Sequence, residues 1–262
     1  MLGSSTVGLK KQHKCVLIHG GGGVHFNEEH VLTKAVHKMF VDEDLYSIEL
    51  PGHGSTSQNE SIDVFKAKNI LREKIFPLIE ESNKNDQRVV FVGFSIGGKF
   101  VQSLWSEITR RSQREPAGVF IAAPPLNSMS RWWLIKMFWT TFAFQLRGSA
   151  SIMQRLHGDG WKQMVGNCRE WLLPNSPMHC DLDSMKSLTS GNDDVFWIRG
   201  DYDQPFPKKD FEYLPAHAVI SVHSGHFDFF STRTGWKETS AALNQCLSRI
   251  IISTDKQNHK QP

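Results

Sequence analysis

The sequence predicts an α/β fold with a mostly parallel sheet of about six strands, helices on both faces of the sheet and an inserted helical lid. Short apolar runs alternate with segments long enough for a helix, which is typical of parallel sheets. One aromatic-rich stretch interrupts this alternation and predicts the insertion. A chain of 262 residues is long enough to bury the core of one such domain.

The expected strands are short and rich in β-branched and aromatic residues. They cover residues 15–18, 45–49, 89–92, 118–122, 195–198 and 218–222. Helices are expected at about 27–40, 61–82, 97–112, 207–214 and 234–252. In a parallel sheet, ligands bind beyond the carboxyl ends of the strands, so the chemistry of the protein is expected at that edge.

The predicted domain organisation has three parts. Residues 1–125 and 193–253 form the core, because they carry all of the expected strands. Residues 126–192 have no strand pattern and form the lid. Residues 254–262 are polar and are expected to be a disordered tail.

The composition of the lid predicts an apolar and adaptable inner face. Residues 126–192 hold five of the eight tryptophans and six of the eight methionines. Substrate contacts are expected from Trp132, Trp133 and Trp139. Two other interpretations stay open, namely a lid that only packs on the core and a lid that touches a membrane surface.

Charge and cysteine content argue against several classes of function. The net charge is only +3 and there is no dense Lys/Arg block, so nucleic-acid binding is not expected. The four cysteines, Cys15, Cys168, Cys180 and Cys246, lack metal-ligand spacing and are expected to be reduced, so we expect no metal. No cofactor is expected either. Neither a signal-peptide core nor a membrane-spanning apolar run is evident, which predicts a cytoplasmic protein. The oligomeric state stays open.

A Gly-x-Ser-x-Gly motif is the most informative feature of the chain. The sequence Gly-Phe-Ser-Ile-Gly at 93–97 follows the apolar run 88–92 and precedes a stretch, 99–112, that can be helical. A strand, a tight turn and a helix in this order lift a nucleophilic serine above a sheet. Ser95 is therefore the candidate nucleophile, and its neighbour Phe94 is a candidate substrate contact.

A serine nucleophile needs a histidine base, and the histidine needs a carboxylate partner. Asp203 and His226 follow the fifth and sixth expected strands, which gives the chain order Ser, Asp, His. Asp203 precedes a proline-containing turn that can aim it at the edge of the sheet, but Asp201 remains an alternative. His226 follows a glycine in the last loop, and His223 competes with it.

Acyl transfer also needs N–H donors for the oxygen of the tetrahedral intermediate. The N–H of Ile96, directly after the candidate nucleophile, is one candidate. The other is expected from the glycine-rich loop at 19–23, with Gly21 favoured, because glycines let the backbone approach a substrate oxygen closely. Together these groups predict an oxyanion hole.

Five motifs share a family likeness. They are His-Gly at 19–20, Leu-Pro-Gly-His-Gly-Ser at 50–55, Gly-Phe-Ser-Ile-Gly-Gly at 93–98, Gly-Asp-Tyr-Asp at 200–203 and Gly-His at 225–226. In this combination the chain resembles the α/β-hydrolase superfamily from about residue 14 to about residue 250. The resemblance implies a serine-type hydrolase with Ser95, Asp203 and His226 in the triad roles. It also implies a cap inserted after the fourth strand.

The leading expectation is hydrolysis of a carboxylic ester or thioester through an acyl-enzyme. A hydrophobic acyl or aromatic group is expected in the substrate because the lid is apolar. A carbon–carbon bond lyase or hydrolase on the same fold is an alternative, and so is a catalytically silent binding protein. The expected partner is a small hydrophobic ester or thioester.

Overall fold

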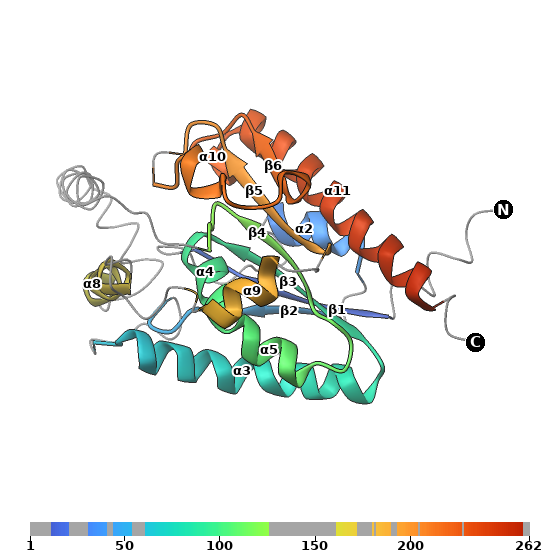
Figure 1. Ribbon diagram of the computed structural model, residues 1–262. Coiled ribbons are helices and arrows are strands. Elements are labelled where there is room, and N and C mark those ends of the chain that lie inside the picture. The colour runs from blue at the N-terminus through green and yellow to red at the C-terminus, as the bar shows by residue number, and fades with distance from the viewer. Residues whose placement is uncertain are drawn as a thin grey trace.

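A computed structural model shows one sheet with helices packed on both of its faces (Figure 1). The described residues are 12–20, 31–40, 44–53, 61–125, 161–171, 180, 182–189, 193–203, 205–226 and 228–258. Within them, six strands pair in parallel in the order β2-β1-β3-β4-β5-β6. They are β1 His13–Ile18, β2 Leu45–Ile48, β3 Arg88–Phe94, β4 Ala117–Ile121, β5 Val195–Gly200 and β6 Val219–Val222. This sheet confirms the fold class predicted from the sequence.

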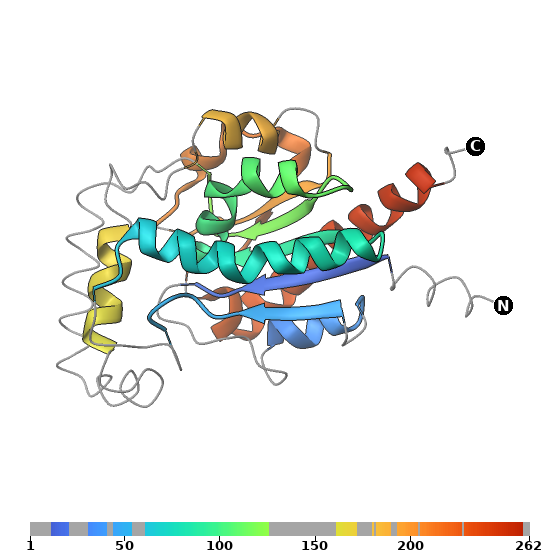
Figure 2. The same cartoon turned by 90° about the horizontal axis from the view of Figure 1, so that it is seen from below.

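Helices cover both faces of the sheet (Figures 1 and 2). One face carries α3 Val64–Lys84, α4 Ser95–Ser103, α5 Trp105–Arg111 and α9 Leu182–Thr189. The other face carries α2 Val31–His37, α10 Asp228–Ser231 and α11 Arg233–Asn258. The remaining described helices are α8 Trp161–Trp171 and the short 3-10 helices η4 Lys208–Phe211 and η5 Ala216–Ala218. No helix in the described ranges is long and apolar enough to cross a membrane.

Successive residues of β1 contribute to two separate cores, because the side chains of a strand alternate between its faces. Val16 and Ile18 pack in the core that holds α3 and α4, whereas Cys15 and Leu17 pack in the core that holds α2 and α11. All six residues of β1 are buried. Burial on both faces explains why the central strands are largely apolar runs rather than alternating ones.

The single helix expected at 97–112 is two helices. Leu104 separates α4 from α5, because its backbone lies outside the helical region with φ −105° and ψ 2°. Directly after this break, Trp105 is fully buried. Its ring packs edge-on against Phe91 of β3 and Phe120 of β4, with centroids 6.1 and 5.7 Å away. The break therefore accompanies the anchoring of α5 on the sheet.

The last part of the predicted lid packs with the layers of the core. α9 falls within 126–192, yet it lies against α4 and α5, and its Leu188 is buried in the core on that face. The hydroxyl of Ser184 accepts a hydrogen bond from the backbone N–H of Ser106 in α5 (3.3 Å). α9 is therefore a layer helix, and the lid prediction applies only to the residues that precede it.

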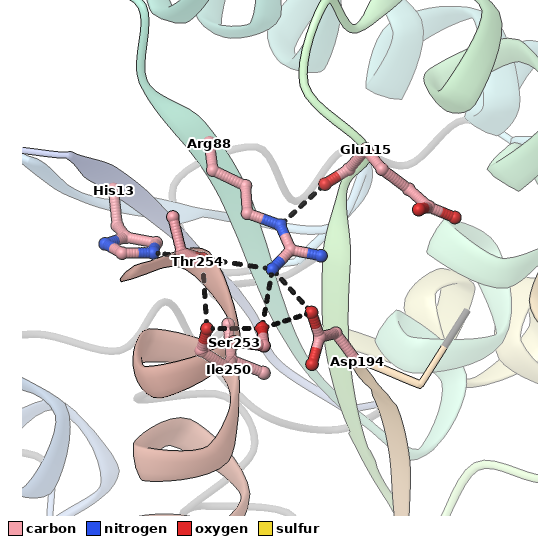
Figure 3. Close-up of polar contacts among 7 residues, drawn as sticks. All are labelled: His13, Arg88, Glu115, Asp194, Ile250, Ser253 and Thr254. Atoms are coloured by element: carbon pink, nitrogen blue, oxygen red, sulfur yellow. Dashed lines mark hydrogen bonds and ion pairs between the residues drawn. The ribbon is translucent and has the colours of Figure 1, made fainter. Parts of the chain in front are cut away.

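The last helix is longer than expected. α11 continues to Asn258, so the prediction of a disordered tail from residue 254 onward is wrong for residues 254–258. The polar sequence of this segment favoured exposure, but Thr254 is fully buried. The physical reason is a hydrogen-bonded network at the amino-terminal edge of the sheet (Figure 3).

Arg88 is the centre of this network (Figure 3). Its Nη1 donates to Asp194 Oδ2 (2.6 Å) and to the Thr254 hydroxyl (3.1 Å), and its Nε donates to the carbonyl of Glu115 (2.6 Å). His13 Nε2 lies 3.0 Å from the same hydroxyl of Thr254. These contacts join the amino-terminal ends of β1, β3, β4 and β5 to the last turns of α11.

The nucleophile turn depends on backbones that approach without side chains between them. α4 starts directly at the end of β3, and Ser95 has a φ of 48°, which L-amino acids rarely adopt. A Cβ on Gly93 would lie 2.5 Å from the Cα of Gly98, and a Cβ on Gly97 would overlap the carbonyl oxygen of His19. Glycine at these positions therefore lets α4 pack directly on β1 and β3.

Arg88→Met is expected to lower the free energy of unfolding by about 3–5 kcal/mol, because it leaves the Asp194 carboxylate buried without its partner. Urea denaturation measures the change. Arg111→Met is the control, since Arg111 and Glu80 form an exposed pair at 3.9 Å that is worth about 1 kcal/mol or less. Equal losses in the two variants would contradict this account of the network.

Gly97→Ala is expected to destabilise the protein by about 3 kcal/mol or to prevent folding, because the new Cβ meets backbone atoms of β1 that cannot move aside. Gly166→Ala is a matched control in α8. A Cβ on Gly166 has its nearest described neighbour, Gln163 Nε2, at 3.9 Å, and alanine favours a helix by about 1 kcal/mol. Thermal unfolding compares the variants, and a Gly97→Ala protein as stable as the parent would refute the tight packing.

Candidate active site

Three loops at one edge of the sheet bring the predicted serine, aspartate and histidine together. Ser95 directly follows β3 as the first residue of α4, Asp203 follows β5 and His226 follows β6. Because all of the strands are parallel, their carboxyl ends lie at the same edge. Ser95 Oγ lies 3.0 Å from His226 Nε2, and His226 Nδ1 lies 3.0 Å from Asp203 Oδ2. The three side chains thus form one continuous line of hydrogen bonds.

The line of hydrogen bonds assigns a tautomer to the histidine. The Asp203 carboxylate accepts from Nδ1–H of His226, so Nε2 carries a lone pair that faces the hydroxyl of Ser95. A neutral imidazole in this orientation can take the serine proton. The arrangement is able to turn a weak nucleophile into a reactive one.

The carboxylate of Asp203 is held by two donors. Its side chain is fully buried, and its Oδ1 accepts from the backbone N–H of Phe206 (3.0 Å) while Oδ2 faces His226. Asp201 differs, since 43% of its side chain is exposed and it pairs with Arg199 at 3.3 Å. The geometry therefore selects Asp203 over Asp201 as the partner of the histidine.

The competing histidine, His223, lies outside this line of hydrogen bonds. It is exposed, its backbone N–H donates to Glu238 (2.6 Å), and its ring packs edge-on against Tyr202 with centroids 4.6 Å apart. His53 belongs to the Leu-Pro-Gly-His-Gly-Ser motif at 50–55. It is buried, and its Nδ1 lies 3.1 Å from the Pro51 carbonyl oxygen. Its ring packs near that of Trp171, with centroids 6.1 Å apart.

One of the two predicted oxyanion donors can be placed. Phe94 provides no side-chain cap for α4, and the first N–H groups of a helix have no partner within the helix. The N–H of Ile96 is one of these groups and also lies at the positive end of the helix dipole. Gly21 falls outside the described residues. Its neighbour Gly20 reaches the site, since a Cβ on Gly20 would lie 3.2 Å from the Cβ of Ser95.

Aromatic rings surround the histidine of the site. The ring of Phe94 stacks on His226 with centroids 5.5 Å apart and an interplanar angle of 26°, and it meets Phe230 edge-on at 4.9 Å. The ring of Phe206 also lies 5.5 Å from that of His226. Phe94 was a predicted substrate contact, whereas Phe206 and Phe230 were missed. The signal for Phe206 was its place between two prolines, three residues after Asp203.

The predicted lid tryptophans cannot be placed at the site, because Trp132, Trp133 and Trp139 lie outside the described residues. The described part of the same insertion, α8, reaches the core through Trp171. Its ring is buried and packs edge-on against Phe100 of α4, with centroids 5.1 Å apart. α8 is thereby attached to the helix that begins with the candidate nucleophile.

Three of the four cysteines are buried in the core, and two of them, Cys15 and Cys246, are unsuited to nucleophilic catalysis. Burial raises the pKa of the Cys246 thiol to about 12 and raises the pKa of Cys15 still further, so both stay protonated at neutral pH. None of the four cysteines forms a disulfide. The described ranges hold no cluster of three or more His, Cys, Asp or Glu side chains that could bind a metal ion.

Several solved structures share this fold at low sequence identity. NosK from Streptomyces actuosus is 13% identical with a TM-score of 0.61, over 91% of this chain and 98% of that chain. The 2-hydroxy-6-oxo-6-phenylhexa-2,4-dienoate hydrolase from Rhodococcus sp. strain RHA1 is 13% identical with a TM-score of 0.62, over 91% and 92%. A thermophilic esterase from Thermogutta terrifontis is 13% identical with a TM-score of 0.59, over 90% of each chain.

Sequence comparison identifies the family. Comparison with curated protein sequences gave no significant match. A model of the alpha/beta hydrolase family, by contrast, matches residues 15–256. The match runs from β1 into α11 and includes the loops that carry Ser95, Asp203 and His226. The chain belongs to the alpha/beta hydrolase family.

Proposed function

We propose that this hydrolase cleaves a carboxylic ester or thioester through an acyl-enzyme on Ser95. The observation that carries the proposal is the hydrogen-bonded line from Ser95 Oγ to His226 and on to Asp203, with both distances at 3.0 Å. Membership of the alpha/beta hydrolase family supports hydrolysis, and a solved structure of similar fold is an esterase. The geometry of the side chains supports a nucleophile, a base and a group that orients the base.

The proposed reaction has two stages. Ser95 Oγ attacks the carbonyl carbon while its proton passes to His226 Nε2, and the buried carboxylate of Asp203 stabilises the imidazolium that forms. The carbonyl oxygen becomes an oxyanion, which accepts from the N–H of Ile96 and from a second N–H that we assign to Gly21. His226 then gives its proton to the departing alcohol or thiol. In the second stage water, activated by the same histidine, releases the acid and restores the serine.

The proposed substrate carries a hydrophobic acyl or aromatic group. The ring of Phe94, the neighbour of Ser95 in the chain, stacks on His226 and meets the ring of Phe230 edge-on, which makes this side of the site apolar. The tryptophan- and methionine-rich residues of the insertion that precede α9 are proposed to cover the site as a lid, with Trp132, Trp133 and Trp139 as substrate contacts. Apolar area buried in this way favours fatty or aromatic acids over sugars.

A fluorophosphonate probe is expected to label the parent protein and not Ser95→Ala, because the probe reports an activated serine. Ser103→Ala is a matched control, since Ser103 is a buried serine of the same helix whose hydroxyl donates to the Phe100 carbonyl (2.8 Å). It should be labelled like the parent. Labelling is read on a gel and located by peptide mass. Equal labelling of Ser95→Ala, or none of the parent, would overturn the proposal.

Asp203→Asn is expected to lower kcat for short p-nitrophenyl esters by roughly a thousandfold or more, because the histidine loses the group that fixes its tautomer. Asp201→Asn should retain the parent rate, since the Asp201 carboxylate pairs with Arg199 instead. Steady-state kinetics on a series of acyl lengths measures both variants. Comparable losses in the two would contradict the assignment of Asp203. A labelled parent that turns over none of these esters would instead favour carbon–carbon bond cleavage.

A further inference from the structure

Lys99 carries an amino group in the core, close to the candidate site. It lies one helical turn after Ser95 in α4, and only 1% of it is exposed. Its Nζ donates to the carbonyl of Pro124 (2.9 Å) and lies 5.4 Å from the centroid of the Phe206 ring. Lysine is rarely buried to this extent, so its contacts indicate a specific role.

The first contact is with the point where the chain leaves the sheet. Pro124 follows β4 and is succeeded by the residues that lead toward the proposed lid. The preceding carbonyl, of Ala123, accepts from Nε2 of Gln102 (2.8 Å), which lies three residues after Lys99 in α4. Two buried side chains of one helix therefore hold two successive carbonyls at the end of β4.

The second contact is with the loop that carries the acid. The backbone N–H of Phe206 donates to Asp203 Oδ1 (3.0 Å), and the ring of Phe206 packs on His226 with centroids 5.5 Å apart. The ring of Phe206 thus lies against the histidine and also within cation–π distance of the Lys99 ammonium. A shift of Phe206 would disturb the carboxylate and the imidazole together.

Opposing effects set the pKa of Lys99. Burial lowers its pKa to about 8, while electrostatic interactions with Cys180 and Asp210 act to raise it. Asp210 belongs to η4, and Cys180 precedes α9, so these are the titratable groups that face Lys99 from the neighbouring segments. Beyond the ring of Phe206 lies His226 with its carboxylate partner. The cation–π contact exists only while the amine is protonated.

We propose that Lys99 is a positioning residue of this hydrolase. Its ammonium holds Phe206 and the Pro124 carbonyl against α4, and through Phe206 it keeps Asp203 and His226 aligned with the nucleophile. The inference rests on the proposed function of the triad. It predicts that activity falls as Lys99 loses its proton above about pH 8 and that the fall appears in kcat rather than KM, because Lys99 does not reach the substrate.

The test compares pH profiles of kcat and KM on p-nitrophenyl butyrate for the parent, Lys99→Met, Lys99→Arg and Lys209→Met, from about pH 6 to about pH 10. Lys99→Met should have a kcat about tenfold or more below the parent at neutral pH and no fall near pH 8. Lys99→Arg keeps its charge over this range and should recover part of the rate without that fall. Lys209 is an exposed lysine of η4, and Lys209→Met should match the parent.

Labelling of each protein with the fluorophosphonate probe separates the two proposals. A parent that is not labelled refutes the proposed function. A labelled parent beside a Lys99→Met variant with the parental kcat and the same fall near pH 8 refutes only the role of Lys99. If Lys99→Met does not fold, a fall of kcat near pH 8 that persists unchanged in Lys99→Arg also refutes the role of Lys99.

A stability measurement checks that the variant reports on Lys99 itself. The pKa of the amine is about 8 in the fold, against 10.5 for an ordinary lysine. Between these values the unfolded chain binds more protons than the folded chain, so the parent gains stability relative to Lys99→Met as pH rises from about 8 to about 10.5. Thermal unfolding across this range should show that gain. A constant difference between the two proteins would refute the titration of Lys99 that the proposal uses.

Discussion

The direct contact of the first turn of α4 with β1 and β3 is the constraint on which the rest of the site depends. Glycines at 93, 97 and 98 let three backbones meet without side chains between them, and the unusual φ of Ser95 ends the strand and begins the helix in one residue. The height of the serine oxygen above the sheet is therefore set by backbone packing, which is far less adjustable than side-chain packing. His226 has only to reach that oxygen, and Asp203 to reach His226, from loops at the same edge.

Much of this arrangement could be predicted from the sequence, because its signals are local. A strand buried on both faces is an apolar run, and the turn residues that follow it mark the edge of the sheet. The choice between Asp203 and Asp201 was less secure. The two carboxylates differ in burial and in their donors, namely the Phe206 N–H for one and the Arg199 side chain for the other. These differences arise from the path of the loop, which cannot be predicted from the spacing of residues along the chain.

The features that sequence analysis missed depend on contacts between distant segments. Thr254 is polar and looks like part of a tail, yet Arg88, 166 residues earlier, buries it at the end of α11. From the sequence alone, Lys99 would be placed on the exposed side of a helix, because lysine is usually exposed. Its burial becomes evident only when β4 and the loop after β5 are folded around α4. In both cases a polar side chain is buried by partners that no local pattern identifies.

The contact between His13 and Thr254 brings the two ends of the described fold together. These residues begin the first strand and lie near the end of the last helix, 241 positions apart, yet their side chains are 3.0 Å from each other. A covalent link across so short a gap would close a loop of almost the whole chain. By the chain-entropy argument, such a closure would stabilise the folded state by about 5 kcal/mol. The link would lie at the amino-terminal edge of the sheet, on the opposite side from the serine, so the path of the substrate would stay open.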